Sequence, residues 1–279
     1  MTTRIRIADT LLSCLRSEIP DVDRIRVDKV CLGLGYTAVK LSTGHVGLCH
    51  SLLTEAPLEC CQIVRRAGTL AGSPAIALAE LIKSWDMGEK VVGAATVNAL
   101  SQIILAHPSR KYRITEGSLI DRIDIKRDDI VALVGNIRPI VQDIRSKAGK
   151  LYIFERGGII DEDVLPDVAS EELLPKASVV IITGTAIANG TIDRLLELSR
   201  GARYIALIGP SATVVPDPLF ERGVSAIAGV IAVDSERVMQ IVSEGGGTPQ
   251  LKAAVKFVVI EPAKLMARSA GSLCQQRRG

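Results

Sequence analysis

One stretch of the chain, residues 178–212, limits its fold more than any other. It reads SVVIITGTAIANGTIDRLLELSRGARYIALIGPSA, with two apolar runs at 179–182 and 204–208 that each end in a turn rich in glycine, threonine or serine. A continuous β-branched run such as VVII predicts a strand covered on both faces of a parallel sheet. Between the runs, the apolar positions of residues 191–199 recur at helical spacing, and Gly201 follows where a helix cap belongs. The stretch therefore predicts a strand, a helix and a strand, with both turns at the edge where open α/β sheets bind ligands.

The same alternation continues through the second half of the chain. Further strand-like runs occur at 130–134, 151–154, 226–231 and 257–260, mostly separated by spacers of helix length. Such repetition is typical of a doubly wound α/β sheet. Hydrophobic residues make up 47% of the chain and aromatic residues only 3%, so the core must be built from Val, Ile, Leu and Ala, which suits a buried parallel sheet. We expect the last run, after the glycines at 245–247, either to close the sheet edge or to return to the first part of the chain.

The first part of the chain follows a different pattern. Residues 5–19 have apolar positions at helical spacing before Pro20, and residues 24–52 alternate in three short runs separated by turns. These patterns predict a helix followed by an antiparallel meander. Two alanine-rich segments, 75–82 and 91–105, are expected to be helices. The first part therefore predicts an α+β unit.

The polar sequence RITEGS, at 113–118, interrupts this pattern. At 279 residues the chain is long enough for two ordinary domains. We therefore place a domain boundary there and expect an α+β domain at 1–115, followed by an α/β domain at 116–279.

Charge and cysteine content disfavour several classes of function. The net charge of +3 comes from 34 basic and 31 acidic residues scattered along the chain, which gives no basic patch for a nucleic acid or a membrane surface. Arg4, Arg6 and Asp9 stand where a signal peptide needs an apolar core, and the uncharged stretch 91–109 carries polar side chains unsuited to a membrane span. Six cysteines without a regular spacing are expected to be reduced. We therefore expect a cytoplasmic protein, and its oligomeric state, a homo-oligomer included, stays open.

Candidate ligand-binding residues follow the first two expected strands of the second domain. Gly135 and Asn136 end the first, and Glu155 ends the second, twenty residues after Gly135. In dinucleotide-binding sheets an acid at this interval hydrogen-bonds a ribose hydroxyl. However, the sequence GNIRP is not G-x-G-x-x-G, so a nicotinamide dinucleotide is disfavoured and a ligand with one ribose, or none, stays open. The alternative is that Glu155 pairs with Arg138 or Arg156 at the surface.

The turns after the next two strands offer hydroxyl, amide and backbone N–H groups. Residues 183–185 and 189–191 precede a helix, an arrangement that can hold an anion, and their two glycines let a ligand approach the backbone. The alternative is ordinary helix capping by Thr185 or Asn189. Ser211 lacks the G-x-S-x-G sequence of a nucleophile elbow, and the chain has only three histidines, so a serine hydrolase is disfavoured. Ser211 is better interpreted as a hydrogen-bond donor.

One group of soft metal ligands lies in the first domain. It consists of adjacent Cys and His residues, a Cys pair and two intervening acids, at positions Cys49, His50, Glu55, Glu59, Cys60 and Cys61. Thiolate and imidazole suit zinc or another transition metal. Neighbouring residues of a strand point to opposite faces, however, and cysteine is commonly buried, so we expect Cys49 and His50 not to join the Cys pair in one tetrahedral site. Stoichiometric zinc that is lost on mutating Cys60 and Cys61 would refute this expectation.

Sequence motifs along nearly the whole chain carry a resemblance to a known family. They include GLGYTAVKL, LAGSPAIALAEL, ATVNAL, VALVGNIRPIV, LYIFER, ASVVIITGTAIANGTIDRLLEL, ALIGPSATVVPDPLF and EGGG. Together they resemble the two-domain family of putative heavy-metal chelation proteins. The resemblance implies an amino-terminal domain like that of enolase, a Rossmann-like second domain and a site in the cleft between them. With the residues discussed above, the candidate binding positions are Asn98, Gly135, Asn136, Glu155, Thr183, Gly184, Thr185, Asn189, Gly209, Pro210 and Ser211.

Two functions are compatible with these observations. The first is binding of a small anionic or metal-chelating ligand, with heavy-metal handling as the implied role and a transition metal or metal chelate as the implied cofactor. The second is a transferase or lyase that uses a nucleotide-like cofactor such as S-adenosylmethionine. The sequence alone decides neither the ligand nor whether a reaction is catalysed.

Overall fold

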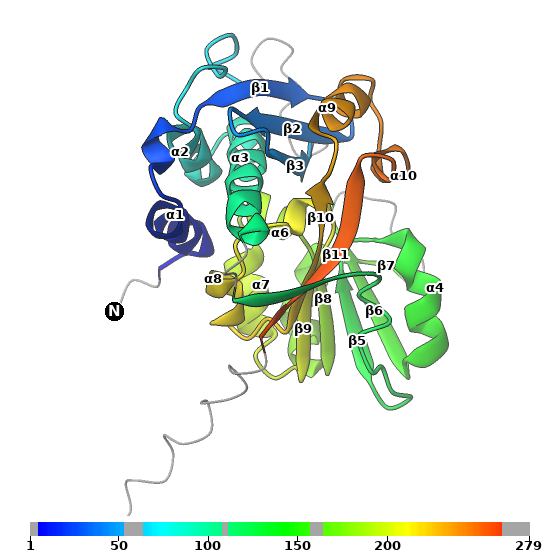
Figure 1. Cartoon of the computed structure of the whole chain (residues 1–279). Coiled ribbons are helices and arrows are strands. Elements are labelled where there is room, and N and C mark those ends of the chain that lie inside the picture. The colour runs from blue at the N-terminus through cyan, green and yellow to red at the C-terminus, as the bar shows by residue number, and fades with distance from the viewer. Residues whose placement is uncertain (1–4, 53–63, 108–110, 157–163, 264–279) are drawn as a thin grey trace, which may run out of the picture.

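The computed structural model describes residues 5–52, 64–107, 111–156 and 164–263. It contains a three-stranded antiparallel sheet and an eight-stranded, mostly parallel sheet, with helices packed on both (Figure 1). This mixed α/β architecture confirms the fold class expected from the sequence. Among the described residues, no helix combines the length and apolar character that crossing a membrane requires.

The small sheet is the antiparallel meander expected from the sequence, and two helices and two 3-10 turns precede the long helix that covers it. These elements are α1 (Ile7–Glu18), η1 (Val22–Arg24), β1 (Val27–Leu32), β2 (Tyr36–Leu41), β3 (Val46–His50), α2 (Ala75–Ala79), η2 (Glu80–Lys83) and α3 (Met87–Ala106). Helix α3 is buried along almost its whole length, because it packs on β2 and β3 and also contacts elements of the second half of the chain.

The large sheet has the strand order β4-β11-β10-β9-β8-β5-β6-β7. Its strands are β4 (Tyr112–Glu116), β5 (Ile130–Val134), β6 (Lys150–Glu155), β7 (Val164–Pro166), β8 (Val179–Thr183), β9 (Tyr204–Ile208), β10 (Ala226–Ala232) and β11 (Val255–Pro262). Its helices are α4 (Arg138–Lys147), η3 (Asp167–Ala169), α5 (Ser170–Leu173), η4 (Leu174–Lys176), α6 (Thr185–Ala188), α7 (Ile192–Leu198), η5 (Pro210–Ala212), α8 (Asp217–Phe220), α9 (Ser235–Ser243) and α10 (Thr248–Leu251).

Six neighbouring strands, β5 to β10, run parallel. With β5 as the first, their spatial order is 3-2-1-4-5-6, the order of doubly wound sheets that bind ligands where the order reverses. That switch point lies between β5 and β8, which pair directly. The runs at 130–134 and 179–182 therefore lie in one sheet, as the sequence patterns predict. The carboxyl ends of these two strands are therefore the first place to look for a site.

Two strands of the large sheet, β4 and β7, are not predicted by the sequence patterns. The polar segment RITEGS predicts a break in the pattern, but its first residues form β4, an edge strand that pairs antiparallel with β11. A strand that pairs on one side only needs no apolar run, so its polar composition is no obstacle. Strand β7, at the other edge, is only three residues long. The run at 257–260 belongs to β11, which lies between β10 and β4, so β4 rather than the last strand forms the sheet edge.

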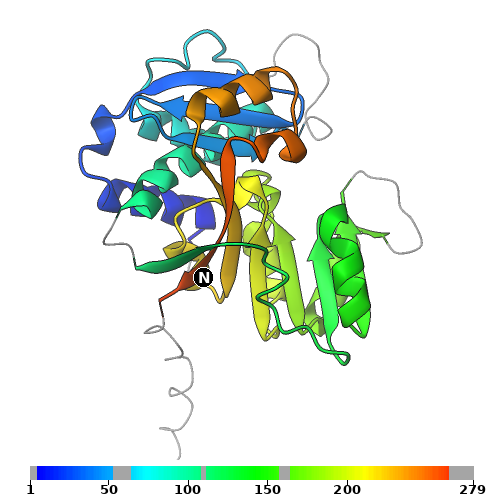
Figure 2. The same cartoon turned by 45° about the vertical axis from the view of Figure 1, so that its right-hand side comes forward.

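Three apolar cores hold the molecule together. The largest joins α1, α2 and α3 to one face of the large sheet, and a second lies between the other face and α4. The third lies on the small sheet, where Tyr36, Ala38 and Leu48 pack against α9 and α10. Figure 2 shows these two orange helices lying over the blue small sheet. The last third of the chain thus completes the packing of the first, and the boundary near residue 115 stays a prediction.

Asp129, directly before β5, ties the starts of three strands together. Its carboxylate accepts hydrogen bonds from Ser178 Oγ (2.7 Å), just ahead of β8, and from Arg203 Nε (3.2 Å), just ahead of β9. Mainly because of the Arg203 guanidinium, the pKa of Asp129 is lowered to about 2. The Asp129 side chain is only 6% exposed, so solvent screens this ion pair weakly.

We expect this ion pair to make the free energy of unfolding depend on pH in the acid range. Because the pKa of Asp129 is depressed in the folded state, its contribution is present above the unfolded pKa of about 3.9 and is lost as the pH falls towards about 2. Asp129→Asn should lower the free energy of unfolding at pH 7 by about 2 kcal/mol and weaken its dependence on pH in this window. Urea unfolding at pH 7 and pH 3 measures both, with the exposed neighbour changed in Asp128→Asn as control. An acid dependence that Asp129→Asn leaves unaltered would contradict this account.

Candidate functional site

A cavity of about 260 Å³ lies at the carboxyl ends of β5, β6 and β8. Its walls come from those strand ends and from η3, α5, α6 and α7, so every lining residue falls between 134 and 198. The cavity therefore sits at the switch point of the large sheet, and the described part of the first 107 residues does not line it. Five of the candidate binding residues line it together, namely Gly135, Glu155, Thr183, Thr185 and Asn189.

Glu155 ends β6 and turns its carboxylate towards the turn after β5. Its Oε2 accepts a hydrogen bond from the backbone N–H of Asn136 (2.6 Å), and its Oε1 accepts one from the N–H of Arg156 (2.9 Å). The Arg156 side chain donates from Nε to Asp167 Oδ2 (2.9 Å). Backbone N–H groups thus fix the Glu155 carboxylate at the cavity wall. Asn136 contributes its backbone N–H to this contact.

Gly135 is a glycine because the end of β5 passes close to the end of β8. Its φ is +95°, which L side chains rarely adopt, and an added Cβ would lie 2.9 Å from Thr183 Cβ. A side chain at this position would push the two strand ends apart. The small residue therefore allows the cavity to form at the switch point.

The hydroxyl and amide groups at the start of α6 and α7 bond to one another. The hydroxyls of Thr183 and Thr185 are 3.1 Å apart, and Asn189 Oδ1 accepts from the N–H (3.2 Å) and the hydroxyl (2.8 Å) of Thr191. The N-cap residues of the two helices are Gly184 and Thr191, and neither helix has a side-chain cap. Thr185 and Asn189 are therefore not helix caps in this structure, and both line the cavity.

Charged side chains in the cavity wall are mostly paired. Arg194 donates from Nε to Glu171 Oε1 (3.0 Å) and from Nη2 to Oε2 (2.5 Å), and this guanidinium lowers the pKa of Glu171. Arg156 and Asp167 form the second pair. Since Glu155 adds a further carboxylate, acidic groups outnumber guanidinium groups among the described lining residues. Such a wall favours ligand groups that donate hydrogen bonds over free anions.

The other candidate residues lie elsewhere, at the junction of the two sheets. Asn98, on α3, donates from Nδ2 to the carbonyls of Leu48 (2.6 Å) and Ser211 (3.1 Å), while Ser211 Oγ accepts from the N–H of His50 (2.9 Å). A Cβ on Gly184 would lie 2.3 Å from the backbone N of Ala212, so η5 packs directly on α6. Gly209, Pro210 and Ser211 therefore join the end of β9 to β3 and α3 and do not line the cavity.

Several lining residues had no signal in the sequence. Arg156, Asp167, Glu171 and Arg194 pair across segments that no spacing rule connects. Only the position of Arg156, directly after the candidate Glu155, could have suggested one of them. The ion pairs form because η3 packs against β6 and α5 packs against α7, an arrangement that depends on the whole fold.

Cys49 is buried and its thiol is held in the protonated form. Burial raises its pKa to about 12, and its Sγ lies 3.4 Å from the carbonyl oxygen of His50. Cys60, Cys61, Glu55 and Glu59 lie outside the described residues. Within the described residues, no group of three or more His, Cys, Asp or Glu side chains is placed to hold a metal ion. The expectation about a tetrahedral site therefore stays a prediction.

Fold and cavity together define a class: an α/β protein with a small antiparallel sheet, a large, mostly parallel sheet and a cavity at its switch point. The chain belongs to the family described as "Putative heavy-metal chelation", DUF364, which it matches over residues 118–261, and a second family with the same description, DUF4213, matches residues 14–101. This confirms the resemblance drawn from the sequence motifs.

Three similar proteins are described without an assigned function, and two of them have solved structures. A Methanocaldococcus jannaschii protein described as uncharacterized is 29% identical over 180 residues, 64% of this chain and 68% of that one. A Pyrococcus horikoshii structure of unknown function from the same family has a TM-score of 0.76 at 22% identity and covers 92% of this chain and 98% of its own. A Desulfitobacterium hafniense family structure, also of unknown function, has a TM-score of 0.73 at 26% identity, with 91% and 98% coverage.

Proposed function

We propose that this protein binds a small organic ligand of the metal-chelating type in the cavity at the ends of β5, β6 and β8. The observation that supports this most is the Glu155 carboxylate, fixed by two backbone N–H groups at the wall of a cavity at the switch point. Ligand sites in sheets of this order lie at that position. A bound metal would then reach the protein through its organic chelator.

The chemistry of the lining residues limits the class of ligand that can bind. Glu155 accepts hydrogen bonds, and Thr185 and Asn189 can both accept and donate them. The guanidinium groups of Arg156 and Arg194 already bind carboxylates of the protein. A ligand with hydroxyl or amino groups therefore fits better than a small free anion, which would meet an excess of carboxylates.

A second candidate function is a transferase or lyase with a nucleotide-like cofactor such as S-adenosylmethionine. It is supported by the position of Glu155 at the end of β6, the second strand in the 3-2-1-4-5-6 order, where an acid commonly binds ribose. Titration with transition metals, with and without the ligand that copurifies with the protein, separates the two functions. Metal retained only together with that ligand supports chelate binding, and binding of S-adenosylmethionine without metal supports the enzyme.

Removing one polar group from the cavity tests the site itself. With the copurified ligand identified by mass spectrometry, we expect Thr185→Ala and Asn189→Ala each to weaken its binding by about 1–3 kcal/mol, because a buried ligand group loses its partner. Neither side chain caps a helix, so thermal stability should change little in Thr185→Ala. In Asn189→Ala it should fall by about 1 kcal/mol, because Oδ1 accepts from the N–H and the hydroxyl of Thr191. Calorimetric titration and thermal unfolding of the same variants measure both quantities.

A matched threonine far from the cavity provides the control for these variants. Thr115→Ala, on edge strand β4, should leave ligand affinity unchanged. If thermal stability falls in Thr185→Ala and Asn189→Ala while affinity stays constant, these residues serve only the local turn and the proposed site is wrong.

A further inference from the structure

The turn between β5 and α4 occupies the position where sheets of this order hold phosphate. In such proteins the backbone N–H groups of the first βα turn, at a helix amino terminus, face the anion. Here the corresponding turn contains Asn136, and its N–H donates to Glu155 Oε2 at 2.6 Å. The protein's own carboxylate thus fills a place where a phosphate oxygen would bind.

This contact works against a phosphorylated ligand. A phosphate in the turn would have to displace Glu155 from the Asn136 N–H or lie beside it with like charge, and both alternatives cost free energy. The wall offers little compensation, because Arg194 is bound by both Glu171 and Glu197. The same residue that favours hydrogen-bond donors therefore disfavours phosphate.

The remaining acceptor capacity of Glu155 matches two neighbouring hydroxyls. An ionised carboxylate has about four lone-pair directions, shared equally between its two oxygens. One on each oxygen is used, by the N–H groups of Asn136 and Arg156. Within the described part of the chain, one direction on each oxygen stays available, which suits two O–H groups on adjacent carbons.

The size and the apolar part of the cavity limit the rest of the ligand. Its volume of about 260 Å³ lies just below the usual range for small-molecule sites, about 300–1,000 Å³. Val134, Phe154, Leu195 and Leu198 give it apolar surface. A single ring system with a diol fits these limits, and a dinucleotide does not.

We propose that Glu155 selects an unphosphorylated ligand carrying a vicinal diol and excludes the phosphorylated forms of such ligands. This inference rests on the proposed function and names its ligand class. Two sources share the chemistry: the ribose of a nucleoside, and a catechol-type chelator in its metal-free form, which keeps both O–H groups as donors. The diol groups bind the two oxygens of Glu155, and the ring lies on the apolar wall.

Calorimetric titration of the full chain with matched probes tests the proposal. Adenosine is compared with 2′-deoxyadenosine, which lacks one hydroxyl of the diol, and with AMP, which adds a phosphate; catechol is compared with phenol. We expect adenosine or catechol to bind about tenfold or more tightly than the matched compound that lacks one hydroxyl of the diol, and AMP to bind about tenfold or more weakly than adenosine. The diol that binds identifies the source.

The variant Glu155→Gln should reduce the preference for the diol and narrow the gap between adenosine and AMP. The control variant Glu116→Gln, on edge strand β4, should behave as the wild type. The comparison among probes on the wild type needs no variant, so it decides the question even if Glu155→Gln does not fold. AMP binding as tightly as adenosine, equal binding of diols and their matches, or no binding of either diol would each overturn the proposal.

The proposed ligand-binding function is tested separately, by the affinity of the protein for the copurified ligand. If neither diol binds but Thr185→Ala still weakens the copurified ligand, the cavity is the site and only the diol selectivity is wrong. If Thr185→Ala and Asn189→Ala also leave that ligand unaffected, the proposed function is wrong as well.

Discussion

Replacing Gly47 with alanine is expected to destabilise the fold by about 3 kcal/mol, near the upper end of the cost of overpacking a core. Gly47 lies in β3, where an added Cβ would be 2.1 Å from the carbonyl oxygen of Ala95 and 2.1 Å from the backbone N of Ala99. Both atoms belong to the backbone of α3, so no side-chain rotation can relieve the clash. The helix would have to move away from the small sheet.

The position of α3 matters to more than the small sheet. Gln102, on the same helix, donates from Nε2 to the carbonyl of Val46 (2.6 Å) and accepts at Oε1 from the N–H of Ala232 (3.2 Å). A shift of α3 would therefore disturb its contacts with β3 and β10 together. Urea unfolding measures the loss, with Gly201→Ala as a control because its nearest atom would be 3.8 Å from the new Cβ. A loss in Gly47→Ala no larger than in the control would show that the helix yields at little cost.

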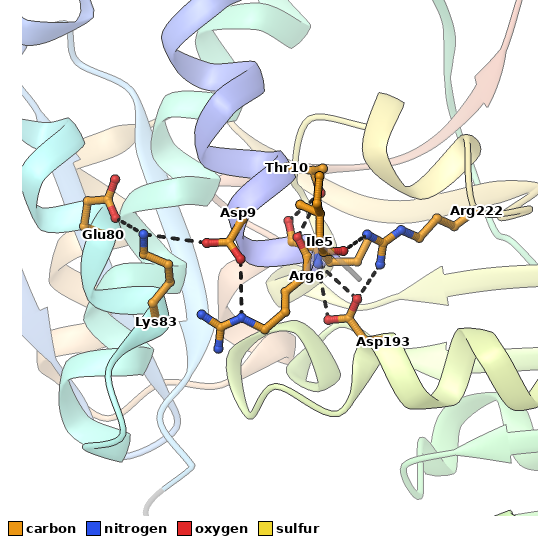
Figure 3. A network of polar contacts seen from close by, with 9 residues as sticks. Ile5, Arg6, Asp9, Thr10, Glu80, Lys83, Asp193 and Arg222 are labelled. Atoms are coloured by element: carbon orange, nitrogen blue, oxygen red, sulfur yellow. Dashed lines mark hydrogen bonds and ion pairs between the residues drawn. The ribbon is translucent and has the colours of Figure 1, made fainter. Parts of the chain in front are cut away.

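Asp193→Ala is expected to cost about 2–3 kcal/mol, because it leaves partly buried donors without their acceptor. Figure 3 shows Asp193, on α7, facing the start of α1. Its carboxylate accepts from the N–H of Ile7 (3.1 and 3.3 Å) and from the Arg222 guanidinium, which also donates to the carbonyl of Ile5. Helix α1 has no local side-chain cap, so this distant carboxylate supplies the anion that its amino terminus favours.

A second acid in the same view separates this effect from surface electrostatics. Asp9 pairs with Arg6 and Lys83, but its side chain is 38% exposed, whereas Asp193 and Arg222 are 27% and 19% exposed. Asp9→Ala should therefore cost less than about 1 kcal/mol. Thermal and urea unfolding of the two variants test the difference, and Asp193→Asn should lie between them because it keeps one acceptor. Equal losses of stability in Asp9→Ala and Asp193→Ala would mean that the contact of Asp193 with the start of α1 stabilises the fold no more than a surface ion pair does.

The sequence predicts those strands whose own residues show that they are buried. Strands β5, β8 and β9 are covered on both faces, so each is a short apolar run that ends at a turn. Strand β4 is stabilised by its pairing with β11, far away in the sequence, and its own residues 112–116 are largely polar. Local patterns contain no information about such a partner.

The candidate site shows the same limit. Glu155 could be found because its interval from Gly135 reflects the geometry of one βαβ unit. Asn98 and Ser211 are equally polar, but their partners include backbone groups of β3, so they join the two sheets. A sequence shows that a polar side chain needs a partner, and it does not show whether the partner is the chain itself or a ligand. The pairing of Arg194 with Glu171 depends on the path of α5 and has no sequence signal.

The cover that α9 and α10 place over the small sheet has a consequence for synthesis. Strands β1 to β3 leave the ribosome early, yet the apolar face formed by Tyr36, Ala38, Val46 and Leu48 packs against residues from Val230 onward. Until those residues emerge, this face stays in water or against whatever else is nearby. The packing of the amino-terminal sheet therefore cannot be completed until the segment 230–255 has been synthesised.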